Sequence, residues 1–203
     1  MSDSGHQLHR VMPAQGFALF DTAVGRCGVA WSVRGVAGVQ LPEARESATR
    51  ARLVRRYPGA RETSPSGHIQ QVIDGIAGLL RGEKRDFSAV VLDMEGVPQF
   101  HQEVYAVART IPAGATLAYG DIATRLGDRS AARRVGEAMG QNPFPIIVPC
   151  HRVLAAGGKV GGFSAAGGVT TKLRLLEIEG AQVGNAPTLF DSLPLSARPR
   201  RRS

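Results

Sequence analysis

Apolar and polar positions follow different patterns in the two halves of the chain. In the first half, three short apolar stretches are separated by Gly25 and by the pair Arg34-Gly35. Short apolar runs with turn residues between them are typical of consecutive antiparallel strands. We therefore predict a strand meander with tight turns. Its strands are expected within residues 17–20, 27–33 and 36–41.

Two helices and a further strand are expected after the meander. Residues 43–57 are rich in arginine and alanine and stop before a proline, and residues 66–80 place apolar side chains at helical spacing. Residues 89–92 predict a short strand. A glycine and a proline follow within residues 95–98, so we place a domain boundary near Gly96.

The second half of the chain is expected to be mostly helical. Residues 100–110 and 119–126 predict two helices, and Ser130 stands where it can cap a third. Short helices joined by a tight turn are typical of a helix-turn-helix, but an ordinary helical hairpin gives the same pattern. The third helix has an apolar face of Ala131, Ala132, Val135, Ala138 and Met139, and an outward face of Arg133, Arg134 and Glu137.

A cysteine follows this helical hairpin. Two prolines make residues 141–145 irregular, because proline lacks an N–H donor and restricts the residue before it. The apolar residues 146–148 predict a buried, extended segment that brings Cys150 into the interior. Thr170 stands where it can cap a last helix that ends at Glu179, just before a glycine.

Composition and charge narrow the class of protein. The 203 residues have a mean hydropathy of -0.08 and no apolar run near the roughly 20 residues that a membrane span needs. No secretory signal is visible at the start, so we expect a cytoplasmic protein. The net charge of +8 indicates a polyanionic partner such as nucleic acid, which would make the protein nucleoid-associated. A disordered tail is the alternative, because four of the arginines stand within residues 198–202.

These features predict four parts of the chain. They are a leader (1–14), an N-terminal domain (15–95), a C-terminal domain (96–184) and a basic tail (185–203).

The chain has two cysteines, Cys27 and Cys150, and at least one thiol is available for chemistry, because a reducing compartment disfavours a disulfide between them. An ordinary thiol has a pKa of about 8.5, so a nucleophilic cysteine needs a neighbour that takes its proton. His151 is adjacent to Cys150. Neighbouring side chains of an extended segment point to opposite sides, so a water can carry the proton between them.

Glu179 is the candidate carboxylate to orient His151 and to balance its charge. It lies three residues beyond Leu176 and six beyond Leu173, on the presumed buried face of its helix. An unpaired carboxylate would be costly there, so a partner is expected nearby. The ordinary alternatives are an inert buried cysteine, a core histidine and a solvated glutamate.

Residues 148–153, Val-Pro-Cys-His-Arg-Val, resemble the active-site motif of the methylated-DNA–protein-cysteine methyltransferases, or O6-alkylguanine-DNA alkyltransferases. The resemblance runs from about Phe100 to Gly180. It includes Ile111-Pro112, Ala118-Tyr119-Gly120-Asp121-Ile122-Ala123, Ala131-Ala132-Arg133-Arg134-Val135-Gly136, Asn142-Pro143 and Leu175-Leu176-Glu177-Ile178-Glu179-Gly180. Residues 16–95 resemble the family's variable N-terminal domain only in length and in the order of strands and helices.

The resemblance implies an α+β protein of two domains. The first would be a ribonuclease H-like α/β domain with an antiparallel sheet, and the second a mostly helical domain like a winged helix-turn-helix. The implied activity is the irreversible transfer of a methyl or other alkyl group to Cys150. The alkyl group comes from O6-alkylguanine, or less well from O4-alkylthymine, in double-stranded DNA, after the nucleotide is flipped out. Since no residue is placed to hydrolyse a C–S bond, we expect one turnover per molecule and no cofactor.

The resemblance also implies the roles of individual residues. Cys150 accepts the alkyl group, His151 activates it through water, and Glu179 orients His151. Tyr119 helps to rotate the nucleotide and protonates the leaving guanine, and Arg133 fills the space that the nucleotide leaves. The remaining implied residues are Ala132, Arg134 and Gly136 for DNA binding, Asn142 as a structural link, and Val153, Phe163 and Ser164 for the base pocket.

Some features leave questions open. Phe163 stands where many family members have tyrosine, so the preference for alkyl groups can differ. We expect no metal, because Cys27, His6, His9 and His68 have no spacing typical of a zinc site. We expect a protein that is monomeric in solution, with cooperative binding to DNA left open.

The sequence argues against three rival functions. Alkyltransferase-like binding proteins lack the acceptor thiol, which Cys150 argues against. A bifunctional repair protein and transcriptional activator needs an extra zinc domain with four cysteines, and only Cys27 lies outside the candidate site. A Cys-His hydrolase unrelated to DNA is disfavoured by the basic charge and by the helix that carries Arg133.

Overall fold

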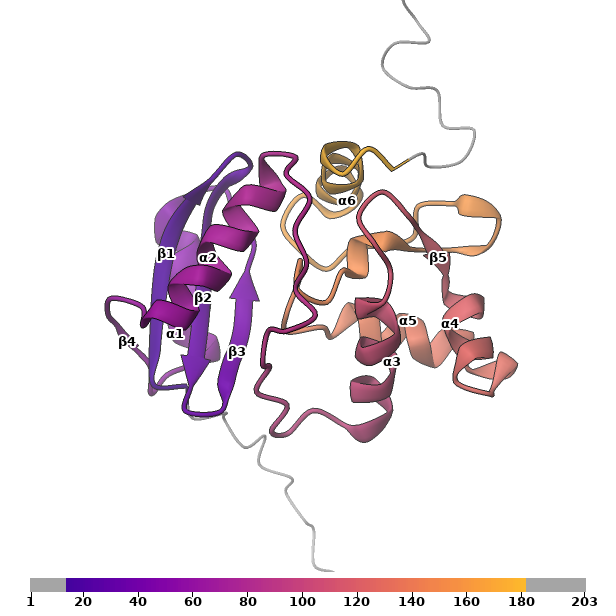
Figure 1. Ribbon diagram of the computed structural model, residues 1–203, viewed down its shortest axis with the longest axis horizontal. Helices are drawn as coiled ribbons and strands as arrows, with labels where there is room; N and C mark the ends of the chain where they lie inside the picture. The colour runs from indigo at the N-terminus through magenta and orange to yellow at the C-terminus, as the bar shows by residue number, and fades with distance from the viewer. Residues whose placement is uncertain (1–13, 182–203) are drawn as a thin grey trace, which may run out of the picture.

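The computed structural model describes residues 14–181 of the chain. A four-stranded sheet with helices lies beside a mostly helical part (Figure 1). The predicted basic tail, and the predicted leader apart from Ala14, lie outside the described residues. Within residues 14–181, no helix is both long enough and apolar enough to cross a membrane.

The predicted meander is confirmed. Strands β1 (Gly16–Thr22), β2 (Gly25–Ser32) and β3 (Gly35–Gln40) pair antiparallel in sequence order. A glycine with positive φ follows each of the two turns and is the first residue of the next strand. The φ is 121° at Gly25 and 138° at Gly35, and a residue with a Cβ would be strained there. A short strand, β4 (Arg61–Glu62), pairs parallel with β1, so the sheet is mixed and not purely antiparallel as expected.

Two helices cover opposite faces of the sheet. Helix α1 (Glu46–Arg56) packs Leu53 on one face together with Phe17 of β1. Helix α2 (Gly67–Leu80) packs on the other face, where it meets the alternate side chains of the same strands. Figure 1 shows α2 crossing in front of the sheet. Both predicted helices are present, with α1 beginning three residues later than expected.

The strand predicted over residues 89–92 is wrong. Only Leu92 of these residues forms a bridge, to Val36 near the start of β3. The Asp93 N–H donates to the Val36 carbonyl at 2.7 Å, and the chain then leaves the sheet edge for the helical part. One point of contact with the edge is too little to form a strand.

The second half is mostly helical, as predicted. It contains α3 (Gln99–Arg109), α4 (Tyr119–Arg125), α5 (Ala132–Gly140) and α6 (Gly168–Ile178). Helix α5 packs against both α3 and α4. Two short parallel strands, β5 (Leu117–Ala118) and β6 (Val153–Leu154), join the start of α4 to the segment after Cys150.

Two predicted helix caps are wrong. Ser130 lies inside a short 3-10 turn before α5, and its N–H donates at 3.0 Å to the carboxylate of Asp128, which is the capping residue there. Thr170 lies in the first turn of α6, which starts after Gly167 with a left-handed φ of 80°. Helix α6 therefore starts after a glycine that adopts this φ without strain, and no side chain caps it.

The segment that leads to the cysteine is buried but not extended, contrary to prediction. Ile146 has a φ of 76°, and the Val148 N–H closes a turn by donating to the Phe144 carbonyl at 2.8 Å. Cys150 and His151 then lie in a 3-10 turn over residues 150–152. Successive side chains in such a turn differ in direction by about 120°, so the side chains of Cys150 and His151 do not point to opposite sides as they would in an extended segment.

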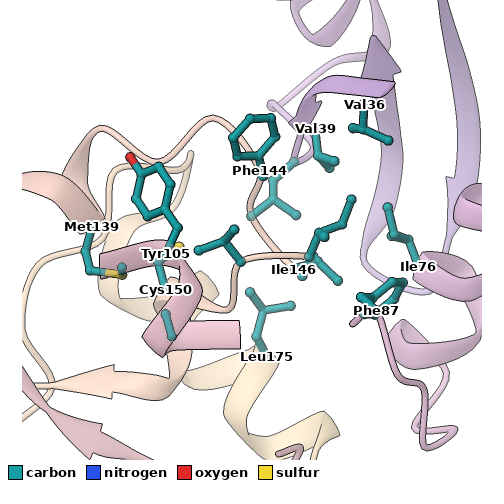
Figure 2. Packing of buried hydrophobic residues seen from close by; sticks show 14 of the residues in the cluster. Val36, Val39, Ile76, Phe87, Tyr105, Met139, Phe144, Ile146, Cys150 and Leu175 are labelled. Carbon is teal, nitrogen blue, oxygen red and sulfur yellow. The ribbon is translucent and has the colours of Figure 1, made fainter. Parts of the chain in front are cut away.

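One continuous apolar core joins the sheet to the helical part. Figure 2 shows Val36 and Val39 of β3 and Ile76 of α2 facing Phe144 and Ile146. The core continues through Tyr105, Met139 and Leu175, and Cys150 belongs to it with 6% of its surface exposed. The candidate nucleophile therefore lies at the junction of the two parts of the protein.

Candidate active site

Hydrogen bonds of Asn142 fix the segment before the cysteine. The Asn142 Nδ2 donates to the Val148 carbonyl at 2.8 Å, and its Oδ1 accepts from the Phe144 N–H at 2.9 Å. Asn142 follows directly after α5 and is itself buried. This side chain thus ties the end of α5 to the turn that precedes Cys150.

His151 and Glu179 are in contact. The His151 Nε2 lies 3.0 Å from the Glu179 Oε1, and both side chains are almost fully buried. The His151 Nδ1 has no hydrogen-bond partner among the described residues. Because a carboxylate only accepts hydrogen bonds, Nε2 carries the proton and Nδ1 has a free lone pair.

Arg152 is the second partner of Glu179, and sequence reasoning missed it. Its Nε donates to Oε2 at 2.8 Å and its Nη2 to Oε1 at 2.7 Å, a two-point contact. A third donor, Nη1, contacts the Ile111 carbonyl. Arg152 immediately follows His151 in the 3-10 turn, so both partners reach the same carboxylate from one turn of chain.

The pKa values in this cluster follow from burial and from these contacts. Burial alone would raise the pKa of Glu179, but the hydrogen bonds from His151 and Arg152 outweigh it and lower the pKa to about 2. Burial lowers the pKa of His151, and Arg152 adds to this, although Glu179 acts against it. At neutral pH the carboxylate is therefore ionised and the imidazole is neutral.

Lys172 is a further buried cation that sequence reasoning missed. It is fully buried in α6, and its Nζ donates to the Val153 carbonyl at 2.6 Å. Burial raises the pKa of the Cys150 thiol, whereas the side chain of Asn142 and the charge of Lys172 lower it. Lys172 thus stabilises the thiolate form of Cys150.

A signal for Lys172 was present in the sequence. The buried face of α6 consists of Lys172, Leu175, Leu176 and the side chain of Glu179, spaced by three or four residues. Leu173, which was expected on this face, is 39% exposed and lies outside it. Counting back four and seven residues from Glu179 would have found Leu175 and Lys172.

A cavity of about 350 Å³ opens onto the cysteine. Its lining brings together Tyr119, Gly136, Cys150, Phe163 and Ser164, which are five of the predicted site residues, with Met139, Gly140 and Gly162. Burial raises the pKa of Tyr119, and the Cys150 sulfur adds to this, so the phenol keeps its proton. Val153 is fully buried and is not among the residues that line this cavity.

The outward face of α5 carries two arginines in different settings. The Arg133 side chain is 92% exposed, with the Glu137 carboxylate 3.3 Å from its Nε. The Arg134 guanidinium instead stacks on the Phe100 ring, 3.9 Å from its centroid. Ala132 is half-buried at the start of the helix. Arg133 is therefore free to reach a partner, whereas Arg134 is held against α3.

Several known proteins are similar to this chain in sequence. Residues 99–181 match the family model described as 6-O-methylguanine DNA methyltransferase, DNA binding domain. A methylated-DNA–protein-cysteine methyltransferase of Methanothermobacter thermautotrophicus is 36% identical over 156 residues, which cover 77% of this chain and 80% of that protein. One of Mycobacterium tuberculosis is 43% identical over 129 residues, covering 64% of this chain and 76% of that protein.

Solved structures are similar over most of the chain. The crystal structure of Mycobacterium tuberculosis OGT in complex with DNA has a TM-score of 0.66 at 31% identity, and the match covers 84% of this chain and 96% of that one. The O6-methylguanine methyltransferase of the same organism has a TM-score of 0.66 at 33% identity, covering 87% of this chain and 99% of that one.

Proposed function

Because this chain belongs to the methylated-DNA–protein-cysteine methyltransferases, we propose that it repairs DNA by moving an alkyl group from O6 of guanine to Cys150. The observation that carries the assignment to Cys150 is its position. It is the cysteine at which a cavity of about 350 Å³ meets a neutral histidine paired with an ionised glutamate. Cys27, in contrast, lies in strand β2 and is fully buried in the apolar core.

The proton of the thiol leaves through His151. Its Nδ1 lone pair can accept that proton through one water, while Glu179 holds Nε2 and stabilises the imidazolium that forms. Arg152 keeps the carboxylate ionised, and Lys172 stabilises the thiolate. These four side chains make Cys150 a nucleophile despite its burial.

The thiolate sulfur then attacks the alkyl carbon on O6. A C–S bond forms as the C–O6 bond breaks, and the electron pair of the broken bond remains on the purine. Tyr119 lines the same cavity and offers its phenolic proton to the leaving guanine. No described side chain is placed to hydrolyse the thioether, so each molecule reacts once and needs no cofactor.

Helices α4 and α5 serve as a helix-turn-helix, with α5 as the recognition helix in a domain like a winged helix-turn-helix. The exposed Arg133 enters the duplex and occupies the space of the flipped nucleotide, which offsets part of the cost of unstacking. Ala132, Arg134 and Gly136 lie against the DNA, and Asn142 keeps α5 in register with Cys150.

The coarser organisation follows the same proposal. Residues 15–95 form a ribonuclease H-like domain and residues 96–184 the DNA-binding and catalytic domain, with the base read at Val153, Phe163 and Ser164. The protein is a monomer in solution and acts at the nucleoid. Its substrates are duplexes that carry O6-alkylguanine and, less well, O4-alkylthymine. Cooperative binding to DNA is compatible with this proposal.

The decisive experiment mixes the protein with a duplex that contains one O6-methylguanine, followed by digestion and mass spectrometry. We expect one methyl group per molecule on the peptide that contains Cys150, and none on the peptide that contains Cys27. A Cys150→Ser variant is the control and should bind the duplex without modification. Tight binding with an unmodified Cys150 peptide in the wild type would refute the transfer, and repeated turnover would refute the single use.

A second experiment tests the role of Arg133. Arg133→Ala should slow repair in duplex DNA more than the reaction with free O6-benzylguanine, because only the duplex requires extrusion of a nucleotide. Arg174→Ala, which removes an exposed arginine of α6 outside the recognition helix, is the control. Equal losses on both substrates would contradict the proposed insertion.

A further inference from the structure

A second, smaller hollow adjoins the cavity at Cys150. It has a volume of about 50 Å³, and it shares Cys150, Phe163 and Ser164 with the larger cavity. Its other side is formed by the sheet part of the protein, including Arg52 and Arg56 of α1. Two guanidinium side chains from the N-terminal half thus line a space that reaches the acceptor sulfur.

The position of this hollow matters because of the direction of the attack. In a displacement at carbon, the incoming sulfur, the carbon and the leaving oxygen lie in one line. Any further atoms on that carbon therefore project sideways, away from both the guanine and the sulfur. The hollow is lined by Cys150, and its 50 Å³ exceeds the roughly 10–15 Å³ that one water requires, so it has room for a small substituent of that carbon.

The hollow has an excess of positive charge. Arg52 is partly balanced, because its Nη1 lies 3.1 Å from the Glu43 carboxylate. Arg56 has no ion pair with any carboxylate of residues 14–181, and its guanidinium lies 5.6 Å from the centroid of the Tyr57 ring. A carboxylate that entered the hollow would meet this unbalanced cation, whereas a neutral alkyl group would gain nothing from it.

We propose that the arginine-lined hollow beside Cys150 gives this protein a preference for alkyl groups that end in a carboxylate, with Arg56 as the selecting residue. The proposal rests on the proposed alkyl transfer and deepens it. In O6-carboxymethylguanine the sulfur attacks the methylene carbon, the C–S bond forms, and the C–O6 bond breaks. The guanine leaves with the electron pair and takes up a proton. The carboxylate is unchanged, lies beside Arg56 and becomes part of the carboxymethyl thioether on Cys150.

The test compares single-turnover rate constants on three duplexes, which carry O6-methylguanine, O6-carboxymethylguanine or the neutral O6-(2-hydroxyethyl)guanine. The hydroxyethyl group controls for size without charge. In Arg56→Gln, we expect the rate for carboxymethyl transfer to fall about fivefold relative to the rates for the two neutral groups, a size typical of a charged hydrogen bond made by an exposed side chain. High salt should shrink the difference between the wild type and the variant.

The matched control is Arg55→Gln. Arg55 has the same charge on the same helix and is exposed, but it does not line the hollow. It should leave the ratio of the three rates at the wild-type value. A ratio that Arg56→Gln does not change, or that Arg55→Gln changes equally, would overturn the inference while methyl transfer remains intact. If none of the three groups reached Cys150 in the wild type, the proposed function itself would fail.

Discussion

Replacement of Glu179 by glutamine removes the one negative charge that His151 and Arg152 share. Glutamine has nearly the same shape, so the change tests charge and not packing. The pKa of Glu179 is lowered from its ordinary 4.5 to about 2, which at about 1.4 kcal/mol per pKa unit corresponds to roughly 3 kcal/mol of stabilisation at neutral pH. Loss of one partner of a buried ion pair costs about 3–5 kcal/mol, which agrees with that value.

The expected loss depends on pH in a defined direction. A carboxyl group with a depressed pKa stabilises the folded protein above pH 4.5, and this stabilisation is lost as the pH falls toward 2. Urea unfolding should therefore show Glu179→Gln about 3 kcal/mol less stable than the wild type at pH 7, with the gap closing between pH 4.5 and 2. Transfer from free O6-benzylguanine should also slow, because His151 loses the partner that fixes its tautomer.

The control is Glu177→Gln on the same helix. The Glu177 carboxylate lies 3.5 Å from Arg174, and both side chains are about 60% exposed. An exposed pair of this kind contributes about 0–1 kcal/mol, so the control should stay close to the wild type. A Glu179→Gln protein as stable as the control at pH 7, or a gap that does not change with pH, would refute the reasoning.

Three further predictions concern other buried groups. Lys172→Met should move the pH–rate profile of Cys150 alkylation to higher pH, because the thiolate loses a buried cation; an unchanged profile would contradict this. Asn142→Ala should lower the free energy of unfolding in urea by about 2–3 kcal/mol through two lost buried hydrogen bonds, and a loss below 0.5 kcal/mol (about one tenth of a typical stability) would argue against that tie. Burial raises the pKa of Cys27 to about 12, so iodoacetamide should label Cys27 at pH 8 only in urea; labelling of the native protein would contradict its burial.

Local patterns were sufficient for the sheet and for most helices. The meander could be predicted from the glycines at its turns, because glycine has no Cβ and adopts positive φ without strain. The strand expected over residues 89–92 failed because this apolar run is not buried: Val91 is 58% exposed, and only Leu92 bridges to the sheet. The caps at Ser130 and Thr170 failed because residues slightly earlier in the sequence start these helical segments: Asp128 caps the 3-10 turn before α5, and Gly167 precedes α6.

The part of the candidate site that could be predicted is the contact that a buried charge requires. A buried carboxylate needs a partner, and Glu179 indeed contacts His151. The buried cations follow the same rule, since a buried charge also needs a partner. Net charge does not distinguish Arg152 and Lys172 from exposed cations, whereas the helical spacing of Lys172 from Glu179 does indicate its burial. The two arginines of α1 at the hollow could not be found from the sequence, because only the folded sheet brings them near Cys150.

The left-handed turn at Ile146 ties the position of Cys150 to the packing of both parts of the protein. A β-branched residue with φ near 76° carries a conformational cost of about 1–3 kcal/mol. The packing of the Ile146 side chain between the sheet and the helices offsets this cost. The place of Cys150 therefore depends on side chains that are far from it in the sequence, and a substitution in the sheet that loosens this packing is expected to change the setting of its thiol.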